Sequence, residues 1–141
     1  MSNSFSNEFD ARLESLPEIH RFVEQATSSF GLDSSDIHDT RLAVEEAVTN
    51  TIIHGYQGRE GRIEIELTRE GQDLKAYLRD DCITFDTTSV PPPDLTKPFE
   101  ERAMGGLGIY LMRQMVDEIH HRAPANGGNE LVLVKRGVCQ G

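Results

Sequence analysis

The chain has 141 residues and a formal net charge of −10, with 37% hydrophobic and 27% charged residues. A chain of this length fits one domain and buries about two-thirds of the surface that it exposes when unfolded, so its core needs no disulfide or metal ion. The negative charge argues against binding to nucleic acid or to anionic lipid, because nothing would neutralise a run of phosphates.

The cysteines and the chain start indicate the compartment. Cys82 and Cys139 belong to no CxxC motif or histidine cluster, so the sequence indicates neither a disulfide framework nor a metal site. The first ten residues are polar and acidic, unlike a signal peptide. No apolar run approaches the roughly 18–20 residues that a membrane-spanning helix needs. We therefore expect a cytoplasmic protein.

The first half of the chain is predicted to form one strand and two helices. A short strand is expected over residues 5–13, and an amphipathic helix over residues 17–30, with a proline in its first turn and a glycine after its end. Residues 33–36 are a cluster of N-cap residues. Residues 37–54 are predicted to form a helix that is buried over much of its circumference, with Gly55 following as its C′ residue.

The second half is predicted to contain a hairpin, a long loop, a helix and a last strand. Ile63, Ile65 and Leu67 alternate with polar residues, which is typical of a half-buried strand. The loop holds three consecutive prolines, and its length is unusual in a compact domain unless it acts as a lid. The expected bounds are 62–69 and 74–80 for the hairpin strands, 86–104 for the loop, 105–121 for the helix and 130–135 for the last strand.

The order of these elements predicts the fold class. A hairpin, few strands and enough helices to cover one sheet face favour a two-layer α+β sandwich. We expect a mixed, mostly antiparallel sheet with the helices on one face. The whole chain, residues 1–141, is predicted to be a single domain.

Glu46, Asn50 and His54 are spaced four residues apart and form a polar ridge on an otherwise apolar helix. One interpretation is that this ridge simply faces solvent, and the residue types alone do not decide against it. The other interpretation is chemical. An asparagine oxygen suits Mg²⁺ as a ligand, and a carboxylate one turn away can orient or deprotonate a hydroxyl group or water.

Two later segments also have functional interpretations. Asp80 ends the second hairpin strand, where its carboxylate can accept a hydrogen bond from an adenine amino group, although a turn-initiating aspartate is the better interpretation in isolation. The run Gly105-Gly106-Leu107-Gly108 precedes a helix, whose N-terminus attracts phosphate. It is not a Walker loop, because no Lys-Ser/Thr follows, and no strand leads directly into it as in a Rossmann fold.

The order of these motifs resembles the anti-sigma factor serine kinases, which belong to the ATPase superfamily shared with histidine kinases, type II topoisomerases and heat-shock chaperones. The likeness covers nearly the whole chain and rests on LAVEEAVTNTIIHGY, LRDDCITFD and GGLGIYLMRQMVDE. It implies the Bergerat fold, with a site for ATP and Mg²⁺ between the helices and the sheet.

The resemblance assigns roles by position. It implies that Asn50 ligates Mg²⁺ and that Glu46, rather than Glu45, is the general base. Asp80 falls where the family has its adenine-binding aspartate.

The resemblance also covers the glycine run and the loop before it. It implies that Gly106 and Gly108 lie against the phosphates, at the end of an ATP lid spanning about residues 87–104. Cys82 and Thr84 depart from the pattern, because they stand where the family usually has glycines. A side chain at position 82 could crowd the base or force a backbone angle that only glycine adopts cheaply.

The function that the resemblance implies is a protein-serine kinase. Its substrate would be a serine of a small anti-sigma-factor antagonist, and it would also sequester a sigma factor. The resemblance is also consistent with a homodimer. The alternative, motivated by Cys82 and Thr84, is a partner-binding module that uses nucleotide only as a switch or has lost it. The phosphotransfer part of a histidine kinase is not expected, since no helical hairpin with a phosphorylatable histidine is recognisable.

Overall fold

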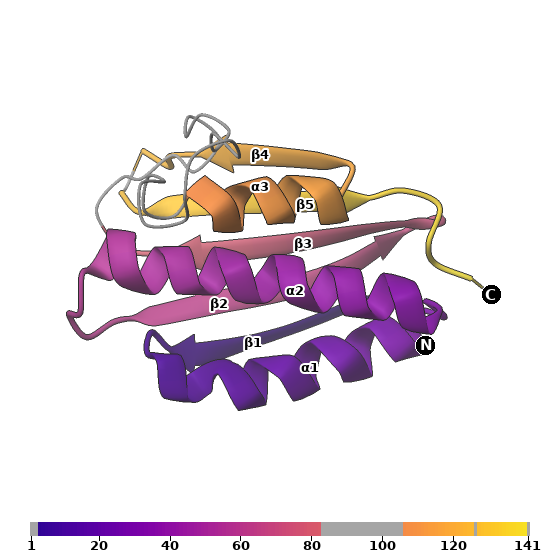
Figure 1. The fold of residues 1–141 in the computed structure, drawn as a ribbon, viewed down its shortest axis with the longest axis horizontal. Coiled ribbons are helices and arrows are strands. Elements are labelled where there is room, and N and C mark those ends of the chain that lie inside the picture. Colours follow the sequence, from indigo (N-terminus) through magenta and orange to yellow (C-terminus); the bar gives the residue numbers. More distant parts are fainter. Residues whose placement is uncertain (1–2, 83–105, 126, 141) are drawn as a thin grey trace.

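The computed structural model describes residues 3–82, 106–125 and 127–140, and Figure 1 shows how their elements are arranged. The strands are β1 (Ser4–Asp10), β2 (Arg62–Glu70), β3 (Asp73–Asp80), β4 (Glu118–Arg122) and β5 (Asn129–Lys135). The helices are α1 (Leu16–Ser29), α2 (Ser34–Asn50) and α3 (Gly106–Met115), with a 3₁₀ turn η1 (Leu13–Ser15) and a π-helical segment η2 (Thr51–Tyr56).

The strands form one sheet in the order β1-β2-β3-β5-β4. The α-helices lie side by side on one face of this sheet (Figure 1), so the predicted two-layer α+β architecture is confirmed. Each strand pair is antiparallel, so the described sheet is antiparallel throughout rather than mixed. Within the described residues, no helix has both the length and the apolar character needed to cross a membrane.

The core fills the space between α2 and the inner face of the sheet, which is the face that the helices cover. Ile63, Ile65 and Leu67 of β2 are at most 1% exposed, as their alternation predicts. Val44 and Val48 of α2 are completely buried above the sheet. Burying each such side chain stabilises the fold by about 1.5–3 kcal/mol, so the packing of α2 against the sheet fixes the position of this helix.

The outer face of the sheet carries a charge network centred on Arg79. This guanidinium contacts Glu64 at 2.6 Å, Glu66 at 2.9 Å and Glu130 at 2.7 Å. Glu64 and Glu130 lie directly opposite Arg79 on the two neighbouring strands. The hydrogen bond from Arg79 lowers the pKa of the Glu66 carboxyl. The guanidinium on β3 therefore binds three carboxylates, two on β2 and one on β5.

Replacing Arg79 by methionine is expected to lower the free energy of unfolding at pH 7 by about 1–2 kcal/mol, because three like charges lose their common partner. The lowered pKa of Glu66 means that this stabilisation is present above the carboxyl's unfolded pKa and is lost as the pH falls through its folded pKa. The difference between variant and wild type should therefore shrink from pH 7 to pH 4 in urea titrations. Arg62→Met is the control: Arg62 pairs with Glu8 and Asp10 at the exposed sheet edge, so its loss should change stability by less than about 0.5 kcal/mol.

Helix α2 differs from its predicted bounds at both ends. It begins at Ser34, because the Asp33 side chain caps it by accepting a 2.8 Å hydrogen bond from the Asp36 amide. At the other end the chain continues into η2 instead of stopping before Gly55. The left-handed residue is Gln57, with φ 56°, so the prediction of Gly55 as the C′ residue is wrong.

The predicted helix to residue 121 is also wrong in its second half. Helix α3 ends at Met115, where the Lys135 ammonium group donates a 2.8 Å hydrogen bond to the last carbonyl oxygen. The Asp117 amide then bonds to the Val134 carbonyl at 2.8 Å, and the chain enters β4 beside β5. Contacts with a strand later in the chain therefore end the helix and add a fifth strand.

Candidate nucleotide site

The predicted site residues lie on elements that meet at one end of the molecule. The C-terminal end of α2, the end of β3 and the start of α3 lie at the same edge in Figure 1. Glu46 and Asn50 belong to α2, Asp80 ends β3, and the segment from Gly106 through Leu107 to Gly108 forms the first turn of α3. Thr84, Gly105 and the lid region 87–104 lie outside the described residues.

Asn50 is a buried amide with an unused donor. The residue is 5% exposed, and its Nδ2 atom has no hydrogen-bond partner among the described residues. Leaving a buried donor unpaired costs about 1–3 kcal/mol. The interpretation of Asn50 as a solvent-facing residue is therefore wrong. A buried amide donor without a protein partner fits an acceptor that a ligand brings, such as a phosphate oxygen, and the Oδ1 oxygen of the same amide is the kind of ligand that Mg²⁺ takes.

Glu46 and Glu45 point to different neighbours of α2. Glu45 lies beside α1, where its carboxylate is 3.3 Å from the His20 ring nitrogen Nδ1. Glu46 is half-buried and lines a small cavity of about 30 Å³ on the α3 side, together with Leu42, Leu111, Met112 and Met115. Of the two carboxylates, Glu46 therefore faces the helix whose first turn carries the glycine run.

The Asp80 carboxylate is held by one of its two oxygens. Oδ1 accepts hydrogen bonds from the Cys82 amide at 3.1 Å, the Cys82 thiol at 2.7 Å and the Asn129 side-chain amide at 2.9 Å. Among the described residues, no donor bonds to Oδ2. The bond from the Cys82 amide makes Asp80 a turn-initiating residue, and the second oxygen still remains open to a ligand donor.

The Cys82 side chain points into the protein, towards Asp80 and Gly55. Burial, together with the hydrogen bond to Asp80, raises the pKa of its thiol to about 12, so the sulfur stays protonated and donates. Its Sγ atom also packs against Gly55: a Cβ atom at position 55 would lie only 2.5 Å from the sulfur. The thiol thus fills the space between η2 and the turn after β3.

Tyr56 at the end of η2 fixes this turn from the other side. Its hydroxyl donates a 2.6 Å hydrogen bond to the Arg62 carbonyl and accepts a 3.1 Å bond from the Asp81 amide. A single phenol oxygen therefore joins η2 to the start of β2 and to the residue after β3. The π-helical turn places Tyr56 where it can make both bonds.

Asn129 and His121 complete the surroundings of Asp80, and sequence reasoning missed both. Asn129 is 6% exposed and its Oδ1 lies 2.9 Å from His121 Nε2. The predicted helix over residues 105–121 includes His121, and Asn129 lies just before the predicted strand over residues 130–135. The alternation of Ile119 and His121 with polar neighbours is the signal that could have indicated β4, although five residues make it weak.

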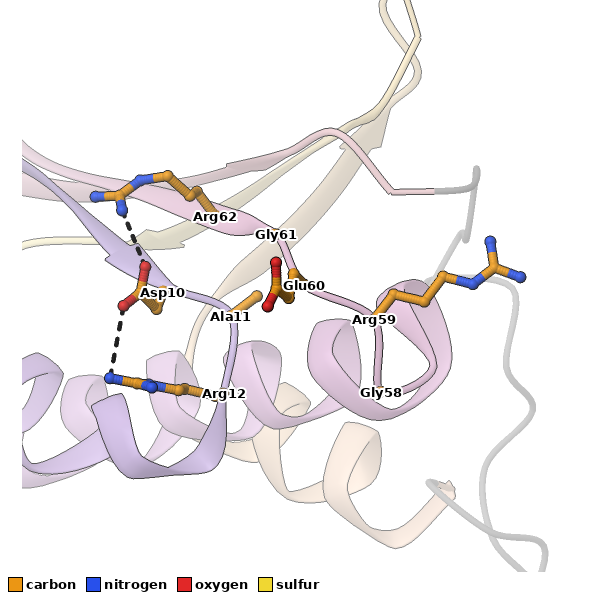
Figure 2. A pocket seen from close by; sticks show the side chains of 8 residues that line it. All are labelled: Asp10, Ala11, Arg12, Gly58, Arg59, Glu60, Gly61 and Arg62. Carbon is orange, nitrogen blue, oxygen red and sulfur yellow. Dashed lines mark hydrogen bonds and ion pairs between the residues drawn. The ribbon is translucent and has the colours of Figure 1, made fainter.

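A pocket of about 560 Å³ lies at the end of β1 and the start of β2 (Figure 2). Three of its charged side chains are paired: Asp10 lies between Arg62 at 2.9 Å and Arg12 at 3.6 Å. Arg59 points away from this pair in Figure 2. None of the predicted site residues lines this pocket.

Comparison with known proteins agrees with the fold and with the motif order. Residues 9–135 match the histidine kinase-like ATPase domain. The chain is 30% identical over 135 residues to the anti-sigma F factor of Clostridium kluyveri, covering 94% of both chains. It is 31% identical over 113 residues to the serine-protein kinase RsbW of Bacillus cereus, covering 77% of this chain and 71% of the relative.

A solved structure has the same fold. The structure of the RsbU and RsbW domains of a Mycobacterium tuberculosis protein superposes with a TM-score of 0.68 and 19% identity, over 96% of this chain. The match spans 32% of that longer chain, and at 19% identity it shows the fold alone. The domain match and the sequence relatives identify the chain as a member of the histidine kinase-like ATPase family, among the anti-sigma factor serine kinases.

Proposed function

We propose that this protein is an anti-sigma factor kinase that binds Mg-ATP and phosphorylates a serine of a small antagonist protein. The observation that carries the proposal is the buried Asn50 amide with its unpaired donor, one helical turn from Glu46. The names of the relatives, anti-sigma F factor and serine-protein kinase RsbW, support the same role. We further propose that it sequesters a sigma factor, acts in the cytoplasm, and forms one domain with a lid over about residues 87–104.

The adenine end of the proposed site is formed by Asp80. The open Oδ2 oxygen would accept a hydrogen bond from the 6-amino group of adenine, while Oδ1 stays bound to the protein. Cys82 would border the base at this end. Thr84 would follow it, at the second position where relatives of this family usually have glycine.

The phosphate end is formed by α2 and α3. The Asn50 side chain would ligate Mg²⁺, which when bound neutralises charge on the phosphates. The backbone of Gly106 and Gly108, with Gly105 and Leu107 beside them, would approach the phosphates at the N-terminus of α3. Positioning and charge neutralisation account for most of phosphoryl transfer in enzymes of this kind.

Glu46 would act as the general base. Its carboxylate would accept the proton of the serine hydroxyl as that oxygen attacks the γ-phosphorus, and ADP would leave with the electron pair of the broken bond. The half-buried position beside α3 supports this role, since Glu45 is engaged by His20 of α1.

A second function remains open because of Cys82. Its thiol occupies the turn where a glycine would leave space, and contacts both Asp80 and Gly55. A chain that no longer binds nucleotide could still act by holding its partner. Nucleotide affinity separates this partner-binding module from the kinase.

Isothermal titration with Mg-ATP tests the proposal. We expect a dissociation constant in the micromolar range, about −8 kcal/mol. Asn50→Ala should weaken binding by about tenfold or more, because it removes the proposed metal ligand. Thr49→Ala, at a neighbouring half-buried position of α2, is the control and should bind like wild type. Wild-type protein without binding at millimolar nucleotide would favour the non-catalytic module.

A further inference from the structure

Three polar side chains meet on the inner face of the sheet, at the end where the proposed adenine contact lies. Asp80 of β3 is directly opposite Asn129 of β5. His121 of β4 is opposite Leu131, two residues further along β5. Side chains two residues apart on a strand share a face, so His121 and Asn129 are diagonal neighbours. The three residues therefore form a row across three adjacent strands.

The hydrogen bonds in this row have a defined direction. A carboxylate is only an acceptor, so the Asn129 side chain must turn its Nδ2 donor to Asp80 Oδ1, at 2.9 Å. Its Oδ1 then faces His121 Nε2 at 2.9 Å and can only accept. His121 Nε2 must therefore carry a hydrogen. The order of donation is from His121 to Asn129 and from Asn129 to Asp80.

We propose that His121 and Asn129 are positioning residues for base recognition, which hold the Asp80 carboxylate so that Oδ2 is presented to a 6-amino purine. The proposal rests on the proposed function, since it takes Asp80 as the adenine contact. His121 fixes the Asn129 amide, and Asn129 fixes the carboxylate by Oδ1. The thiol of Cys82, a weak donor, also bonds to Asp80 Oδ1 but does not set the orientation of the carboxylate.

The consequence is a preference among purines. A fixed acceptor oxygen favours adenine, whose 6-amino group donates, over hypoxanthine, whose 6-oxo group accepts and would be left facing the carboxylate. A carboxylate free to rotate would lose part of this discrimination. The preference for ATP over inosine triphosphate therefore reports the orientation of Asp80, which a purely structural role of His121 would not change.

Two amide substitutions at position 121 test the proposal. In His121→Gln the side-chain nitrogen can reach the place of Nε2, whereas in His121→Asn it reaches only the place of Nδ1. His120→Asn is the matched control, because His120 is the next residue, lies on the outer face and contacts Glu118 at 3.0 Å. Dissociation constants for Mg-ATP and Mg-inosine triphosphate are measured by calorimetry, with thermal unfolding of each variant recorded alongside.

We expect wild type, His121→Gln and His120→Asn to share one preference for ATP. In His121→Asn that preference should fall about three- to tenfold, mainly through weaker ATP binding. Equal preferences in both variants at position 121, or a folded His121→Gln chain that loses the preference, would overturn the positioning role and leave the kinase proposal intact. Wild-type protein that binds neither nucleotide would overturn the proposed function and this inference with it.

Discussion

Glu46→Gln is expected to lower the rate of phosphoryl transfer about 100- to 10,000-fold, the range that a positioned general base contributes. Glutamine has nearly the same shape as glutamate but cannot accept the serine proton. The affinity for Mg-ATP should stay close to that of wild type, because Asn50 and Asp80 are unchanged. The rate is measured as transfer of labelled γ-phosphoryl from ATP to a serine of a cognate antagonist protein.

Glu45→Gln is the matched control for this experiment. It removes the same charge from the neighbouring residue, whose carboxylate faces His20 of α1 rather than α3. Its rate should remain within about twofold of wild type, since surface ion pairs contribute little. Equal losses in the two variants would point to a general effect of charge on α2. A Glu46→Gln chain with wild-type turnover would exclude Glu46 as the base.

The sequence predicts those parts of the fold that depend on local patterns. Ile63, Ile65 and Leu67 indicate β2 to within one residue of its end, because an alternating strand with one buried face has only one register that buries them. The N-cap at Asp33 is similarly local. The helical spacing of Glu46 and Asn50 is equally visible in the sequence, and it places both side chains on one face of α2.

Other features depend on residues distant in the chain. Helix α3 ends at Met115 because Lys135 binds its last carbonyl, and β4 exists because β5 pairs with it. The π-helical turn before β2 is fixed by the bonds of Tyr56 to Arg62 and Asp81. No local pattern contains these contacts, so the helix was predicted too long.

The neighbours of Asp80 could not be predicted for the same reason. Asn129 reaches Asp80 only because β5 pairs with β3 across a long connection, and His121 joins them only through β4. The motif order points to the residues that would touch the nucleotide. The residues that hold those side chains in place follow from the sheet order, which the motifs do not contain.

The approach of β5 to β3 depends most sharply on Gly128, immediately before Asn129. Its φ is +83°, and a Cβ atom there would overlap the backbone carbonyl oxygen of Asp80. Gly128→Ala is therefore expected to lower the free energy of unfolding by at least about 3 kcal/mol, because the left-handed conformation is strained and the backbone contact cannot relax like a side chain. Nucleotide binding should weaken as well, since Asn129 would be pushed away from Asp80.

Gly127→Ala separates the two causes of this loss. Gly127 also has a positive φ, +98°, but no described residue other than its chain neighbours has an atom within 4 Å of the Cβ that alanine would add. The Gly127→Ala variant therefore has the backbone strain without the overlap, and its free energy of unfolding should fall by only about 1–2 kcal/mol. Urea unfolding of both variants, followed by circular dichroism, measures the difference. If the two variants lost the same stability, the close approach of Gly128 to Asp80 would not constrain the fold, and the site would depend on turn conformation alone.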